Sequence, residues 1–224
     1  MKSCCALSAR PWRSSFLLSL LAAATGWLFI GVSNARATDG VHVVRIEEDW
    51  RLVVATPEVS SNSPQVVCAM SPSGGDDGDY MAFELNHQSQ PGYATGGLHL
   101  HAWDGEHLLS SAHTQSAVSM NHHQEQVEWT QSMTLANGML TYEVSQGTSD
   151  TWGTFGAGEL KVTVQTTLTN LNSYNVEATI AGSGVGFGAN RVSSLSLRTV
   201  RLILSTGEVL EVTVNRDVLA TANE

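Results

Sequence analysis

From residue 38 onward, apolar and polar residues alternate with a period of two rather than 3.6. Successive side chains of an extended strand point to opposite faces of a sheet, whereas a surface helix shows an apolar stripe at i, i+3, i+4 and i+7. No run of about ten residues in this part of the sequence has that stripe. The alternation therefore predicts short strands over residues 41–46, 50–55, 65–69, 80–88, 98–103, 126–135, 139–144, 160–169, 176–180, 193–204 and 208–214.

Turn signals between these runs indicate antiparallel pairing. Asn137-Gly138 predicts a hairpin, because both central positions of a type I′ turn need a positive φ. Ser205-Thr206-Gly207 indicates a second hairpin, and the apolar parity of LSLRTVRLIL slips near Arg198 and Thr199, which predicts a β-bulge. About eleven short strands with such turns predict an all-β, antiparallel two-sheet β-sandwich of the jelly-roll type.

The first 37 residues have the layout of a secretory signal. Lys2, Arg10 and Arg13 precede an apolar run over residues 16–32, and Ala35-Arg36-Ala37 has small residues at positions −3 and −1 of a cleavage site. We therefore expect a secreted protein (extracellular, periplasmic or on the cell surface) with a single β-sandwich domain over residues 38–224. The alternative is a retained membrane anchor, for which a run of about 17 residues is at the short limit.

The charge of residues 38–224 argues against certain partners, and their cysteine content argues against a disulfide. This part has 7 basic and 21 acidic residues, a formal net charge of −14. Such a surface repels phosphates and anionic lipids, so nucleic acid and membrane surfaces are not expected partners. Cys68 is its only cysteine and lies in the apolar run PQVVCAM, which predicts a buried thiol and no intrachain disulfide.

Polar side chains gather in the stretch from Gly74 to Trp103. In the strands predicted over 80–88 and 98–103, apolar residues such as Phe83 and Leu100 share one face. If the two strands pair, the opposite face carries a set typical of ligand binding, namely Tyr80, Glu84, Asn86, His99, His101 and Trp103. Aromatic faces that stack on sugar rings, beside amide and carboxylate groups, favour carbohydrate as the ligand. Core packing of Trp103 is the alternative.

Two metal sites are also predicted as alternatives to plain solvent-exposed residues. Asp76, Asp77 and Asp79 form an acidic turn with Gly78, and oxygen ligands in such a loop can hold Ca²⁺. Seven of the eight histidines lie between residues 87 and 123. His99 and His101 would project from one strand face as half of a zinc site, with His113, His122 or His123 as the third ligand.

Three segments resemble the concanavalin A-like lectin and glucanase family, which includes the laminin G modules. They are GTFGAGELKVTVQTTL, SGVGFGANRVSSLSLRTVRLIL and the polar strand ELNHQ. The chain as a whole also resembles small secreted proteins of planctomycete bacteria. The first resemblance implies a jelly roll, a polysaccharide or cell-surface glycan as partner, and calcium at the rim of the sandwich.

The chain departs from that family at the catalytic strand. The hydrolases of the family carry Glu-x-Asp-x-x-Glu, whereas the nearest run here, Glu125-Gln-Val-Glu128, places its carboxylates on opposite faces. Retaining sugar hydrolysis needs two carboxyl groups about 5 to 5.5 Å apart. We therefore expect a non-catalytic binding or surface-interaction domain. The alternatives are a zinc-dependent hydratase or hydrolase using His99 and His101, and a structural cell-surface protein without a small ligand.

Overall fold

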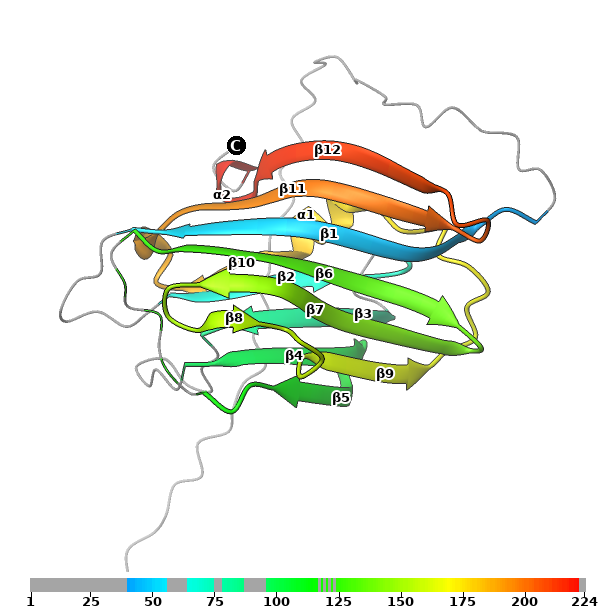
Figure 1. The fold of residues 1–224 in the computed structure, drawn as a ribbon, viewed down its shortest axis with the longest axis horizontal. Helices are drawn as coiled ribbons and strands as arrows, with labels where there is room; N and C mark the ends of the chain where they lie inside the picture. The colour runs from blue at the N-terminus through cyan, green and yellow to red at the C-terminus, as the bar shows by residue number, and fades with distance from the viewer. Residues whose placement is uncertain are drawn as a thin grey trace, which may run out of the picture. The chain divides into compact units, whose positions relative to one another are not determined.

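The computed structural model describes residues 40–55, 64–74, 78–86, 96–116, 118, 120, 122 and 124–221. Within these ranges the chain forms two antiparallel sheets that pack face to face (Figure 1). The predicted all-β two-sheet sandwich is confirmed. The signal segment over residues 1–37 lies outside the described residues and stays a prediction.

The larger sheet has seven strands in the order β12-β11-β1-β6-β7-β8, with β9 also paired to β7. Its strands are β1 (Val43–Val54), β6 (Gln126–Ala136), β7 (Met139–Ser149), β8 (Gly153–Phe155), β9 (Lys161–Gln165), β11 (Val192–Leu204) and β12 (Val209–Asp217). The hairpin between β6 and β7 turns at Asn137 and Gly138, which have φ of 53° and 72°, as the type I′ prediction requires.

The bulge predicted near Arg198 is also confirmed. Along β11, Thr199 pairs with Asp49 of β1, whereas Leu197 pairs with the next residue, Trp50, so Arg198 has no opposite residue in β1. This extra residue moves the apolar side chains of the second half of β11 to the other parity and keeps both halves facing the core.

The smaller sheet has five strands in the order β10-β2-β3-β4-β5. These are β2 (Gln65–Met70), β3 (Asp79–Leu85), β4 (Leu98–Asp104), β5 (His107–His113) and β10 (Gly184–Phe187). The pairing of β3 with β4, on which the predicted polar face depends, is present.

Several predicted elements were wrong. The runs 41–46 and 50–55 are one continuous strand, β1, and β5, β8 and β10 were not predicted. Residues 176–180 were predicted as a strand but belong to helix α1 (Val176–Gly182), whose first turn is capped by the Asn175 side chain. A helix of seven residues is too short to show a clear apolar stripe in the sequence. This helix is stabilised by burial of Thr179 and Ile180 against the rest of the fold. A 3-10 turn, η1 (Ala189–Arg191), and a short helix, α2 (Val218–Thr221), complete the described elements.

The core lies between the two sheets. Trp50 of β1 stacks on Trp129 of β6, with ring centroids 6.2 Å apart, and Phe83 of β3 meets Trp129 edge to face from the other sheet. Cys68 is buried in this core, as predicted. Within the described part of the chain, no helix has the length and apolar character needed to cross a bilayer.

Candidate functional site

The outward surface of the five-stranded sheet carries most of the predicted binding residues. Met81, Phe83 and Leu85 of β3 are fully buried, whereas Tyr80 and Glu84 point the other way and are half-buried. The same alternation in β4 buries Leu98 and Leu100 and leaves its histidines and Trp103 outside. We use "the polar face" for the outward set Tyr80, Glu84, His99, His101, Trp103 and His113.

The strand register places these side chains next to one another. Tyr80 lies opposite Trp103, and Glu84 lies opposite His99. The rings of Tyr80 and Trp103 are stacked, with centroids 6.5 Å apart and planes inclined by 13°. Directly opposite residues share one face of an antiparallel sheet, so the two rings form a continuous aromatic surface.

An apolar side chain of β5 adjoins that aromatic surface. A register shift between Ala102 and Trp103 puts Leu108 opposite Trp103, and Leu108 is 51% exposed. The β5 strand was not predicted, so sequence reasoning missed Leu108. An apolar surface with a half-buried Tyr and Trp is the kind of surface that stacks on a flat apolar ligand face.

Polar groups adjoin the aromatic surface. Oε1 of Glu84 lies 3.3 Å from Nδ1 of His101, and Oε2 of Glu84 accepts a hydrogen bond from the Gln65 side chain. The ring of His101 also meets Trp103 edge to face, with centroids 5.9 Å apart. A carboxylate and an imidazole therefore stand directly beside the aromatic rings.

A third histidine joins this group from β5. His113 lies opposite His99, and the two ring centroids are 5.4 Å apart. The rings of His99 and His101 are 5.8 Å apart. Among the described residues, no three His, Cys, Asp or Glu side chains are arranged to hold a metal ion. His122 is exposed, and His123 lies outside the described residues.

Asn86 does not lie on the polar face, which corrects the sequence prediction. It follows the last residue of β3 with a φ of 59°, and its side chain is fully buried. The amide donates to the carbonyl of Pro64 and accepts from the backbone N–H of Met120. Asn86 therefore joins two loops through its side chain. The prediction failed because the left-handed backbone of Asn86 ends the strand alternation on which it relied.

The acidic turn is described only in part. Asp76 and Asp77 lie outside the described residues, while Asp79 begins β3 opposite Asp104. Burial and the neighbouring Asp104 charge raise the pKa of Asp79, and a hydrogen bond from Thr166 opposes this shift. A bound cation would relieve the repulsion between these two carboxylates.

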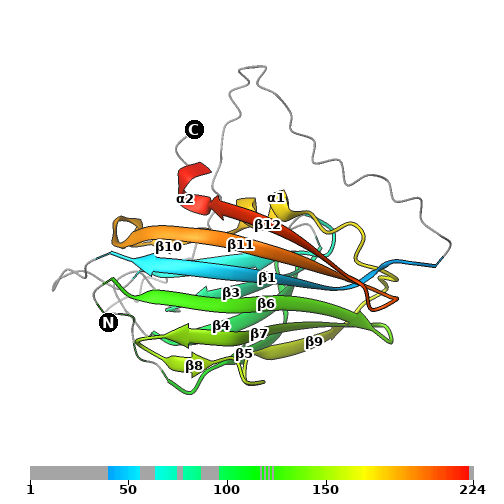
Figure 2. The same ribbon diagram turned by 45° about the horizontal axis from the view of Figure 1, so that its top comes forward.

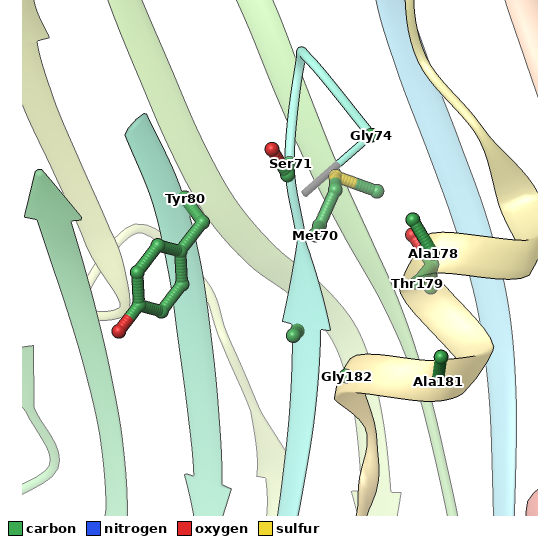
Figure 3. A pocket seen from close by; sticks show the side chains of 9 residues that line it. Met70, Ser71, Gly74, Tyr80, Ala178, Thr179, Ala181 and Gly182 are labelled. Carbon is green, nitrogen blue, oxygen red and sulfur yellow. The ribbon is translucent and has the colours of Figure 1, made fainter. Parts of the chain in front are cut away.

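A cleft of about 310 Å³ opens beside Tyr80, between helix α1 and strands β2 and β3 (Figure 3). Its walls are made mainly of small or apolar residues, including Ala69, Met70, Ala178 and Gly182. Two hydroxyls in its lining are engaged within the protein, since Ser71 donates to the carbonyl of Asp79 and Thr179 donates to Glu48. The cleft suits a small uncharged group projecting from a ligand that lies on Tyr80.

A buried carboxylate behind this cleft was missed by sequence reasoning. Glu48 of β1 is fully buried and accepts hydrogen bonds from four side chains, those of Trp50, Gln131, Tyr174 and Thr179. Burial raises the pKa of Glu48, and these four hydrogen bonds oppose the shift. Because its oxygens are surrounded by the protein's own donors, Glu48 joins α1 to the sandwich rather than facing a ligand.

The outward surface of the seven-stranded sheet carries charged residues that pair with one another. Arg201 of β11 donates to both carboxylate oxygens of Asp49 and to Glu47. A second hollow of about 600 Å³ lies over these residues. An arginine on an exposed surface can bind an anion. Arg201 is already hydrogen-bonded to two carboxylates, so this surface is a weak candidate for anion binding.

Glu125 and Glu128, which come nearest to the catalytic pattern of the hydrolases, have different surroundings and different roles. Glu125 is fully buried and accepts hydrogen bonds from Ser149 and Thr151, whereas Glu128 lies near Arg51 with a side chain 60% exposed. Glu125 therefore fixes the turn between β7 and β8.

The chain matches no protein-family model, and it matches no curated protein.

Proposed function

We propose that this protein is an exported, non-catalytic binding domain that recognises a polysaccharide or cell-surface glycan on the polar face. The observation that carries the proposal is the stacked pair of Tyr80 and Trp103 beside Glu84 and His101. Sugar rings combine apolar C–H faces with hydroxyl groups at the rim, so they need this combination of aromatic surface and polar neighbours. The exposed Leu108 enlarges the apolar part of the surface.

The cleft beside Tyr80 adds a second contact for the same ligand. A glycan lying on Tyr80 would direct one substituent towards Ala178 and Gly182 of α1. The apolar walls favour an uncharged substituent such as a methyl or acetyl group over a carboxylate or sulfate.

The test is a glycan array followed by calorimetric titration of the best oligosaccharide. Trp103→Ala is expected to weaken binding by at least about fivefold, because one stacked aromatic ring contributes on the order of 1 kcal/mol or more. Trp103→Phe retains a ring and should keep most of the affinity. Trp152→Phe is the matched control, since Trp152 donates to Val118 and is not part of the polar face. Absence of binding across neutral and acidic polysaccharides would refute the proposal.

The proposal includes a calcium ion at the acidic turn formed by Asp76, Asp77 and Asp79. Repulsion between Asp79 and Asp104 supports a cation there. Added Ca²⁺ should raise the melting temperature of the wild type and should have a smaller effect on Asp79→Asn. An identical melting temperature in calcium and in chelator would remove calcium from the proposal and leave the glycan surface in place.

A second candidate function is a zinc-dependent hydratase or hydrolase. It is favoured by the close approach of the imidazoles of His99, His101 and His113. Elemental analysis of protein purified without a His tag decides between the two. About one zinc per chain, lost in His99→Ala, would support the enzyme; less than about 0.2 per chain, with no hydratase or esterase activity on zinc addition, would refute it. If neither glycan nor zinc binds, the remaining function is that of a structural surface protein without a small ligand.

A further inference from the structure

Strand β12 forms one open edge of the seven-stranded sheet (Figures 1 and 2). An edge strand presents unpaired backbone N–H and C=O groups, and natural proteins usually protect such an edge with lysine, proline or several charges. The segment Val209–Val214 has the sequence VLEVTV, in which Glu211 is the only charged residue. The stretch of β12 before Asn215 therefore lacks the lysine, proline or multiple charges that protect most edges.

The side chains of β12 are apolar and exposed as well. Val209, Leu210 and Val212 are 52%, 40% and 41% exposed. Val212 lies opposite Val200 of β11, and Val200 is only 4% exposed. The row of side chains that faces the core therefore continues from β11 onto β12, where it is exposed to solvent. Leu210 belongs to the same row, opposite Leu202.

The regular part of β12 ends at Asn215. This residue has a φ of 49°, and the pairing of β11 with β12 shifts register between Leu197 and Thr199. A left-handed residue bends the strand, so an added strand can pair regularly with residues before Asn215 only. The available segment runs from Val209 to Val214.

We propose that a second copy of this chain pairs with β12 in antiparallel orientation about a two-fold axis at Val212. Val212 then lies opposite Val212 of the second copy, and Leu210 lies opposite Val214 of that copy. These contacts place apolar side chains from both copies in one row on the inward face of a continuous sheet. On the outward face, Glu211 lies opposite Thr213, whose hydroxyl can donate to the carboxylate.

Charge also favours this register. The chain has a formal net charge of −10, which opposes association of two copies, so a shared edge must bring few uncompensated acids together. Glu211 is the only acid in the paired segment, and its Oε2 lies 3.9 Å from the Arg201 guanidinium. An axis at Thr213 would instead place Leu210 opposite Arg216, which is already bonded to Glu177, and would require Asn215 to pair.

The first test measures the mass of the full chain by sedimentation or light scattering over a range of concentrations. The wild type is expected to be a dimer that dissociates on dilution. Val212→Lys should weaken the dimer by at least about tenfold, because it places two charges at the axis and removes apolar burial. Leu109→Lys is the matched control: Leu109 is 46% exposed on the edge strand β5, and its substitution should leave the dimer intact. A monomeric wild type, or equal loss of the dimer in both variants, would overturn the proposal.

The second test reads the register directly and does not depend on how Val212→Lys folds. Cysteines at directly opposite positions of an antiparallel pair lie within disulfide range. Val212→Cys should therefore form a disulfide-linked dimer under mild oxidation, whereas Thr213→Cys should not. Cys68 is buried, and Cys4 and Cys5 are replaced by serine in both variants so that no other thiol competes. Cross-linking of Thr213→Cys in preference to Val212→Cys would overturn the register.

Discussion

Glu84 and His101 bridge two neighbouring strands of the five-stranded sheet, with Oε1 of Glu84 3.3 Å from Nδ1 of His101. Their side chains are only 15% and 13% exposed, and Tyr80 and Trp103 stack beside them. The pair therefore presents polar atoms at the margin of an aromatic surface while remaining partly shielded from water. This arrangement makes Glu84 the residue at which glycan binding and stability can best be separated.

Glu84→Gln should keep the fold and weaken glycan binding. The amide oxygen can still accept from Gln65, and the amide N–H can donate to Nδ1 of His101 when that nitrogen carries no proton, so the unfolding free energy should change by less than about 1 kcal/mol. Loss of a charged acceptor for sugar hydroxyls should lower the affinity by about tenfold. Calorimetry and urea unfolding measure the two effects, and Glu128→Gln, on the other sheet, is the control. Equal affinity in both variants would show that the Glu84 carboxylate does not contact the ligand.

Glu48→Ala should destabilise the protein severely. Removal of the carboxylate leaves the donors of Trp50, Gln131, Tyr174 and Thr179 buried without their acceptor. Loss of one member of a buried polar network costs about 3 to 5 kcal/mol. Glu48→Gln retains one acceptor oxygen and should cost less. Urea unfolding at neutral pH measures both, and similar stability of Glu48→Ala and the wild type would contradict the assigned role.

The pH dependence of stability should report the raised pKa of Glu48. Because this pKa lies above its ordinary value of 4.5, the folded protein keeps a proton that the unfolded chain has released. The contribution of Glu48 to stability is therefore greatest below pH 4.5 and declines as the pH rises towards the folded-state pKa. The unfolding free energy of the wild type relative to Glu48→Gln should fall over that interval. A constant difference from pH 4 to neutral pH would be inconsistent with the raised pKa.

Asp49 should give the opposite dependence. Burial raises its pKa, but the hydrogen bonds and charge of Arg201, with a hydrogen bond from Thr130, outweigh burial and lower it below 3.8. The resulting stability is present above pH 3.8 and is lost as the pH falls towards the folded-state pKa. Arg201→Met should remove this acid-side loss and cost about 1 kcal/mol at neutral pH, since both groups are partly exposed. Arg216→Met, at an exposed ion pair with Glu177, is the control for urea unfolding.

Gly156→Ala should destabilise the turn after β8 more than Gly207→Ala destabilises the β11–β12 hairpin. Both glycines have positive φ, 82° and 87°, so either substitution costs about 1 kcal/mol in backbone strain. A Cβ at Gly156 would also lie 2.5 Å from the carbonyl oxygen of Val144, whereas a Cβ at Gly207 would have no atom within 4 Å. Thermal unfolding should show the larger loss for Gly156→Ala. The reverse order would contradict the close backbone approach.

The strands and their faces follow largely from local sequence. Alternation predicted which residues of β3 and β4 face the core, the Asn137-Gly138 turn set one hairpin, and the slip in parity located the bulge at Arg198. These features depend on the two-residue period of an extended chain and on the φ preferences of turn residues. Both are properties of neighbouring residues, so they can be predicted without knowledge of the rest of the fold.

Other features depend on contacts between distant segments. Helix α1 is stabilised by a cap and by packing of Thr179 near Glu48, 131 positions away, so its own seven residues did not predict it. Asn86 follows the strand pattern in sequence, yet its left-handed backbone turns it towards Pro64 and Met120. His113 and Leu108 join the polar face and its aromatic surface only because β5 pairs with β4. Local alternation determines which face of a sheet a side chain points to, whereas pairing between distant segments determines which residues it contacts. The physical reason is that the energy of burying a polar group depends on hydrogen-bond partners that the local sequence does not contain.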